Sequence, residues 1–291
     1  MKLNGRRESS NVDDRRGMSG KTMLGGGIGL SGIIIAALFT LLSGGDLGDV
    51  INAGLTQVAQ NVTEQPASGR EFTAEEEELA KFSRQILAGT EDVWTEVFKS
   101  MGREYESPRM VLYTGSVQTA CGNGSSQMGP FYCSGDQCLY IDLSFFTSMK
   151  KQLGADGDFA YAYVIAHEVG HHVEYLLGKL EAAHQDMAMT SKAEANKISV
   201  RLELLADFYA GVWAYHDNQM FGSLEDGDLE EAINCAHQIG DNYLQEKAQG
   251  YSMPESFTHG TSAQRMRWLK LGLTTGDMSK GTTFSIPYEK L

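Results

Sequence analysis

Residues 164–172 read VIAHEVGHH and place His167, His171 and His172 close to one glutamate, Glu168. The stretch from His167 to His171 fits the pattern His-Glu-x-x-His. Because residues four apart on a helix point to nearly the same side, the imidazoles of His167 and His171 can bind one zinc ion. Glu168 points toward the attacking water and can take its proton. His172 points elsewhere and is predicted to pack against the protein; the alternative for the whole stretch is a helix with incidental surface histidines.

A third protein ligand is expected further along the chain. A metzincin would have a glycine three residues and a histidine six residues after His171, but Glu174 and Leu177 occupy these positions. The other common solution is a glutamate on a following helix, with an aspartate one turn later that orients a ligand histidine. Glu203 and Asp207 match this spacing in the apolar stretch RLELLADFYAG. Two acids on an apolar helical face repel each other without a cation, so we favour these roles over a solvated acidic face.

His259 lies in the segment SFTHGTSAQRMRW, just before a predicted helix capped by Thr261 or Ser262. A turn can direct an imidazole into a cleft, where it could donate a hydrogen bond to the oxyanion of a tetrahedral intermediate. The alternative is a capping or structural histidine. The other histidines have no partner pattern and are predicted to lie on the surface: His184, His216 and His237.

The first 45 residues carry a membrane-topology signal. Residues 1–21 contain six basic and three acidic side chains, and residues 22–45 contain no charge. This uncharged stretch supplies about 30 Å of helix, which is enough to span a bilayer. We expect an uncleaved signal-anchor rather than a cleaved signal peptide. The positive-inside rule then predicts a cytoplasmic tail (1–21), one transmembrane helix in the cytoplasmic (inner) membrane (22–45) and a linker (46–72).

Residues 73–291 are predicted to form one α+β domain outside the membrane, dominated by helices and containing a small sheet. Thr73 and Glu76 form a capping box for a helix that ends near Gly89, and a second helix is expected from Thr90. Strands are expected in RMVLYTGSVQTA and CLYIDLSFF. The remaining helices are expected over residues 158–177, 192–216, 229–248 and 262–273.

The charge and the cysteines restrict the partners and the compartment. A net charge of −14 argues against a nucleic-acid partner, because phosphate binding depends on clustered Lys and Arg. Cys121, Cys133 and Cys138 lie in a loop-like segment, and Cys235 is distant. Disulfides are favoured over a zinc knuckle, which agrees with export, but the sequence alone leaves all the pairings open.

These motifs together resemble the putative neutral zinc metallopeptidase family of bacterial, single-pass membrane-anchored proteins. The likeness rests on residues 167–172, on Glu203 to Asp207 and on FTHGTSAQR, and it extends to GRRESSNVDDRRG, MGPFYC and YIDLSFF. The resemblance implies a zincin fold of the gluzincin kind, with one Zn²⁺ held by His167, His171 and Glu203. It also implies that Glu168 is the general base.

The resemblance also bears on the cysteines. Many family members have a cysteine next to the aspartate, where this chain has Phe208, and no cysteine follows Cys235. The family's bridge implies a Cys121–Cys133 disulfide, and we expect Cys138–Cys235 as a local replacement for the second one.

The predicted function is that of a membrane-anchored, zinc-dependent endopeptidase, with a peptide or protein substrate cleaved outside the cytoplasmic membrane. The substrate is expected to lie extended against an edge strand within LYIDLSFF, residues 139–146. A zinc-stabilised binding or assembly module without turnover is one alternative, although it would not need Glu168. A zinc amidase that acts on cell-wall peptides is the other.

Overall fold

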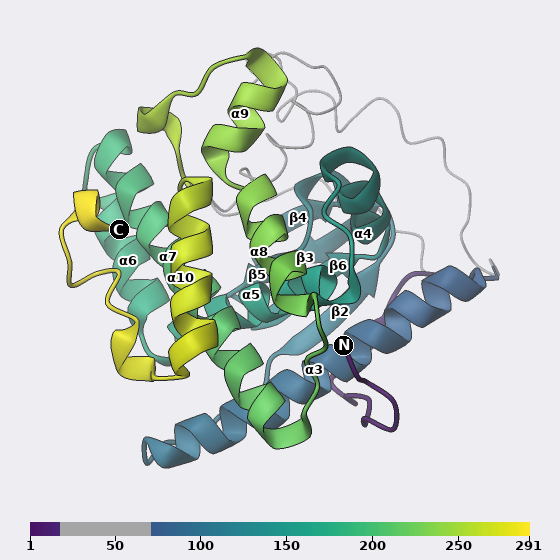
Figure 1. Ribbon diagram of the computed structural model, residues 1–291. Coiled ribbons are helices and arrows are strands. Elements are labelled where there is room, and N and C mark those ends of the chain that lie inside the picture. Colours follow the sequence, from purple (N-terminus) through teal and green to yellow (C-terminus); the bar gives the residue numbers. More distant parts are fainter. Residues whose placement is uncertain (18–70) are drawn as a thin grey trace.

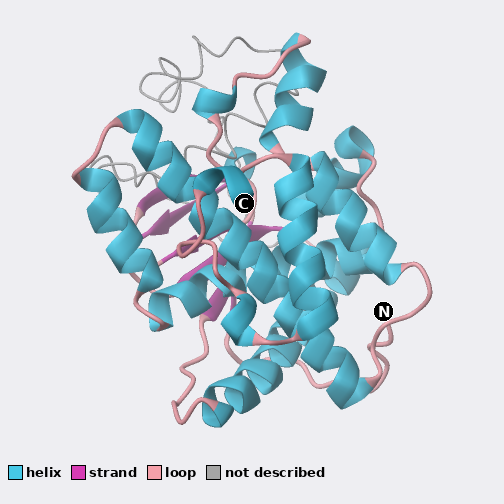
Figure 2. Cartoon of the chain, turned by 60° about the vertical axis from the view of Figure 1, so that its left-hand side comes forward, coloured by secondary structure: helices cyan, strands magenta, loops and turns pink. Residues whose placement is uncertain are grey.

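The computed structural model describes residues 1–17 and 71–291, and within them it has the predicted α+β fold, dominated by helices (Figures 1 and 2). The strands are β1 (Val12–Asp14), β2 (Arg109–Tyr113), β3 (Ser116–Thr119), β4 (Gly122–Ser125), β5 (Phe131–Cys133) and β6 (Cys138–Asp142). The helices are α3 (Ala74–Ser100), α4 (Ser144–Ser148), α5 (Asp158–Leu176), α6 (Lys179–Ala188), α7 (Lys192–Phe221), α8 (Asp228–Gln238), α9 (Asp241–Gln249) and α10 (Ser262–Thr275). One large core joins α3, α5, α7 and α10 to one face of the sheet.

The N-terminal segment is part of this domain. Strand β1 pairs in parallel with β2, in a four-stranded sheet of order β1-β2-β6-β5. The predicted division between a separate tail and the domain is therefore wrong, because residues 12–14 and 109–113 share one sheet. A chain that crossed a membrane once between residues 17 and 71 would separate these two strands.

The predicted transmembrane helix and nearly all of the predicted linker lie outside the described residues. Among the helices of residues 1–17 and 71–291, none is both long enough and apolar enough to cross a membrane.

Helix α3 replaces the two helices predicted around Gly89. The Thr73 capping box is present as predicted, but the helix continues through Gly89 to Ser100. A Cβ atom on Gly89 would lie 2.8 Å from Nη2 of Arg6 and 3.0 Å from Oδ1 of Asp217. The glycine therefore allows the N-terminal segment to approach the helix, and it does not end the helix.

Strand β6 has a neighbour on each side, β2 in parallel and β5 antiparallel. All five of its residues are buried, as is common for a strand inside a sheet. The expectation of a substrate-binding edge within residues 139–146 is therefore wrong: β1 and β5 are the edge strands of this sheet, and residues 144–148 form α4.

The single helix predicted over residues 229–248 is divided into α8 and α9. The break is at Gly240, where an added Cβ atom would lie 2.3 Å from the backbone nitrogen of Ser262. The start of α10 therefore packs directly against the break. As predicted, Thr261 caps this helix.

The cysteines agree with the expectation in part. Cys121 and Cys133 form the disulfide that the family resemblance implied. The expected Cys138–Cys235 bond is wrong, because both residues are buried free cysteines in separate clusters. Cys138 lies in β6, whereas the thiol of Cys235 lies 3.8 Å from the sulfur of Met149 in the large core.

We expect Arg6→Ala to lower the free energy of unfolding by about 3 kcal/mol, because it leaves a buried carboxylate without its cation. Nη2 of Arg6 lies 2.7 Å from Oδ1 of Asp217, whose side chain is 1% exposed. Arg15→Ala is the matched control: its ion pair with Asp13 is about one third exposed at both ends, so its removal should cost less than about 1 kcal/mol. Urea denaturation of the full chain measures both, and equal effects would contradict the structural role of the N-terminal segment.

Candidate zinc site

The predicted ligands come from two helices that approach closely. His167 and His171 lie on α5, and Glu203 lies on α7. Gly170, inside the motif, faces the backbone of Ala206: an added Cβ atom would lie 2.8 Å from the carbonyl oxygen of Ala206. The glycine lets the two helices approach closely enough for Glu203 to reach both histidines.

The three predicted ligands meet at one point. Their donor atoms all lie within 4.8 Å of one another. Oε2 of Glu203 lies 3.2 Å from Nε2 of His167, and Oε1 lies 3.6 Å from Nε2 of His171. Two imidazole nitrogens and one carboxylate form the usual donor set of a catalytic zinc site, which keeps one position open. The residues present therefore fit zinc.

Each histidine of this set has a carboxylate on its other ring nitrogen. Nδ1 of His167 lies 2.8 Å from Oδ1 of Asp207, in the role predicted for the aspartate, and Nδ1 of His171 lies 2.9 Å from Oε2 of Glu174. These contacts leave the Nε2 atoms facing Glu203. Glu174 was missed in the sequence, although its position three residues after His171 on the same helix was a visible signal.

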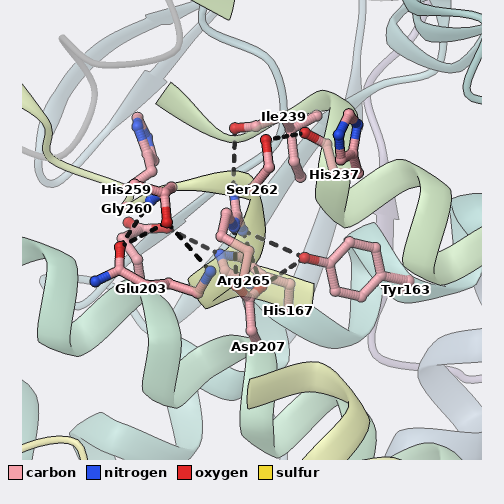
Figure 3. A network of polar contacts seen from close by, with 12 residues as sticks. Tyr163, His167, Glu203, Asp207, His237, Ile239, His259, Gly260, Ser262 and Arg265 are labelled. Carbon is pink, nitrogen blue, oxygen red and sulfur yellow. Dashed lines mark hydrogen bonds and ion pairs between the residues drawn. The ribbon is translucent and has the colours of Figure 1, made fainter. Parts of the chain in front are cut away.

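Asp207 also connects α5 and α7 to α10 (Figure 3). Nε of Arg265 lies 2.8 Å from Oδ2 of Asp207, and Nη2 lies 2.8 Å from Oδ1. The hydroxyl of Tyr163 donates to Oδ1 as well. No motif in the sequence identified Arg265, because its partner lies 58 residues away.

The electrostatics of the site favour a positive charge between the carboxylates. Burial lowers the pKa of His167, but Asp207 and Glu203 together raise it to about 10. Burial raises the pKa of Asp207, but Arg265 and His167 together lower it to about 2. Burial likewise raises the pKa of Glu203, and the nearby His259, His167 and His171 lower it below its ordinary value. The same environment would stabilise a bound metal cation.

Glu168, the predicted general base, lines the same cavity as the three ligands. Its side chain is buried, which raises its pKa, although His167 and His171 oppose this shift. A raised pKa is the usual condition of a carboxylate that accepts and returns a proton near neutral pH.

His259 also lines this cavity, which we call the catalytic cavity. Nδ1 of His259 lies 3.0 Å from Oδ1 of Asp241, and Oδ2 of Asp241 accepts the backbone N–H groups of Thr258, His259 and Gly260. Asp241 therefore fixes both the turn and the imidazole, and the sequence did not identify it.

The other histidines are placed as follows. His172 is fully buried between the hydroxyl of Tyr132 and the carbonyl of Glu106, which confirms that it packs against the protein. His216 contacts the carbonyl of Gly276. The prediction for His184 is wrong: it is half-buried and lines the catalytic cavity.

Comparison with known proteins shows the family of this chain. A family model described as "Putative neutral zinc metallopeptidase" matches residues 1–284. The chain belongs to this family. Its relatives include the Uncharacterized protein YpfJ of Escherichia coli K12, which is 49% identical over 98% of this chain and 99% of its own length. The Uncharacterized protein Rv2575 of Mycobacterium tuberculosis H37Rv is 41% identical over 65% of this chain and 66% of its own length. No solved structure matches the chain.

We expect Arg265→Met to weaken zinc binding by about 10- to 100-fold, because Asp207, without the guanidinium that binds both of its oxygens, then orients His167 less firmly. The zinc-free protein should also lose about 3 kcal/mol of stability, since the buried carboxylate of Asp207 keeps His167 and Tyr163 but loses its guanidinium partner. Titration with zinc against a chelating dye and urea denaturation measure the two effects. Arg267→Met is the control, because Arg267 is exposed on the same helix. Equal zinc affinity in the two variants would contradict the role of Arg265.

Proposed function

We propose that the chain is a zinc-dependent endopeptidase. The observation that carries the proposal is the position of Glu168, which opens onto the same cavity as the His167, His171 and Glu203 donor set. A zinc-stabilised binding module would need the three ligands but no buried carboxylate beside them. A buried acid costs stability unless it has a partner or a task, so its presence favours catalysis.

When bound, zinc polarises the carbonyl of the peptide bond and lowers the pKa of the attacking water. The side chains of the protein perform the proton transfers. Glu168 accepts the proton of the water and returns it to the nitrogen of the leaving amine. Asp241 holds Nδ1 of His259, which leaves Nε2 as the ring nitrogen that can hydrogen-bond to the oxyanion.

We further propose that the enzyme acts outside the cytoplasm. The Cys121–Cys133 disulfide supports an oxidising compartment. Attachment to a membrane through the uncharged residues 22–45 remains a proposal from the sequence. The sheet shared by β1 and β2 favours an arrangement with both flanks of that stretch on one side of the membrane.

The test is the cleavage of an unfolded protein substrate and of peptidoglycan fragments by the zinc-loaded full chain. We expect Glu168→Gln to lower the cleavage rate at least about 100-fold while the zinc content is unchanged, because the proton acceptor is lost. Glu181→Gln, an exposed glutamate, should keep the rate within about twofold of the wild type.

A metal chelator should abolish cleavage, and added zinc should restore it. Cleavage by Glu168→Gln at the wild-type rate would contradict the mechanism. If products are released from the peptidoglycan fragments but not from the unfolded protein, the proposed activity becomes that of a zinc amidase instead of an endopeptidase.

A further inference from the structure

Helix α6 presents one of its faces to the catalytic cavity. Leu180, His184 and Met187 follow the three- and four-residue spacing of a helix face, and all three line the cavity with His167 and Glu168. The opposite face of α6 is exposed at Glu181, Gln185 and Asp186. The helix is therefore amphipathic, and its inner face meets the catalytic cavity.

Apolar side chains make up most of the uncharged lining beyond α6, which also includes Ser134, Ser148, Gln152 and Ser199. Phe131 on the edge strand β5, Phe145, Met149 and Leu202 line the same cavity. The described lining contains no lysine, and its one arginine, Arg265, already pairs with Asp207. Along the described lining an acidic substrate side chain would find no free lysine or arginine, whereas a bulky apolar one would lose its contact with water.

His184 is the polar group of this face. Within residues 1–17 and 71–291 its ring makes no hydrogen bond, and it lines the same cavity as His171. An imidazole without a protein partner that faces a cavity can exchange hydrogen bonds with a peptide backbone.

We propose that the α6 face formed by Leu180, His184 and Met187 is the substrate-recognition wall of the enzyme. It takes a bulky apolar side chain next to the peptide bond that is cleaved, and His184 hydrogen-bonds to the backbone of the same peptide. The preferred substrate is therefore an unfolded segment rich in large apolar residues. The peptide as occupant rests on the proposed function.

The test measures binding rather than cleavage, so it can fail independently of the proposed function. The zinc-loaded full chain carrying Glu168→Gln is titrated with two fluorescent peptides of equal length, one rich in Leu and Phe and one rich in Asp. We expect the apolar peptide to bind at least about tenfold more tightly. Adding Met187→Glu should weaken binding of the apolar peptide about tenfold, because it places a charge in the apolar wall.

The matched control is Met189→Glu, at the residue directly after α6, which is 88% exposed, and it should change the affinity less than about twofold. His184→Leu should weaken both peptides by a similar factor of about five, as expected for a contact with the backbone. Circular dichroism checks folding, and Met187→Ser, with a smaller loss in the same direction, replaces Met187→Glu if that variant does not fold.

The proposal is overturned if the apolar peptide has no advantage, if neither peptide binds, or if Met187→Glu and Met189→Glu have equal effects. Met187-dependent binding in a chain whose wild type cleaves nothing would support the wall and reject the endopeptidase. If the wild type cleaves peptides but peptide binding does not depend on Met187, the endopeptidase is supported and the substrate-recognition wall is rejected.

Discussion

The site depends on the contacts that the buried carboxylate of Asp207 makes. Its two oxygens connect α5 through Tyr163 and His167 to α10 through Arg265, while the residue itself lies on α7. A carboxylate buried at this position without partners would strongly destabilise the fold. Its need for partners therefore fixes the positions of both the guanidinium of Arg265 and the imidazole of His167. The orientation of His167 is therefore determined by the packing of α5, α7 and α10. A substitution in α10 can alter zinc binding although no residue of α10 is a zinc ligand.

Glycines determine how closely those helices approach. Gly170 lets α5 meet α7 at the ligands, and Gly211 meets Gly272 where α7 crosses α10, since a Cβ atom on Gly272 would lie 2.1 Å from the carbonyl oxygen of Phe208. Gly89 does the same for α3 and the N-terminal segment, through Arg6. Ala at these crossings would separate the backbones, and the ligand geometry would change with them.

The sequence predicted that His167, Glu168, His171, Glu203 and Asp207 belong to one site, because a helix fixes the direction of residues four apart, and the α+β class followed from the same periodicity. Apart from this site, it did not predict contacts between distant segments. Residues 12–14 are too short and too polar to identify as a strand until β2 provides the partner. Gly89 and Gly240 illustrate the same limit. The local helix propensity of glycine is the same whether it ends a helix or makes room for a neighbouring segment. Here α3 continues through Gly89, whereas Gly240 separates α8 from α9. Arg265 and His184 were missed because their roles come from tertiary contacts, whereas Glu174 was missed although its contact with His171 is local to α5.

The most direct test of the zinc site is the anomalous scattering at the zinc edge from crystals of the zinc-loaded full chain. We expect one strong peak within bonding distance, about 2.0 to 2.2 Å, of Nε2 of His167, Nε2 of His171 and a carboxylate oxygen of Glu203. A second group of acids, Asp158, Asp228 and Glu231, also has the spacing to hold a cation. A peak at that group, with none at the two histidines, would contradict the assignment of the zinc site.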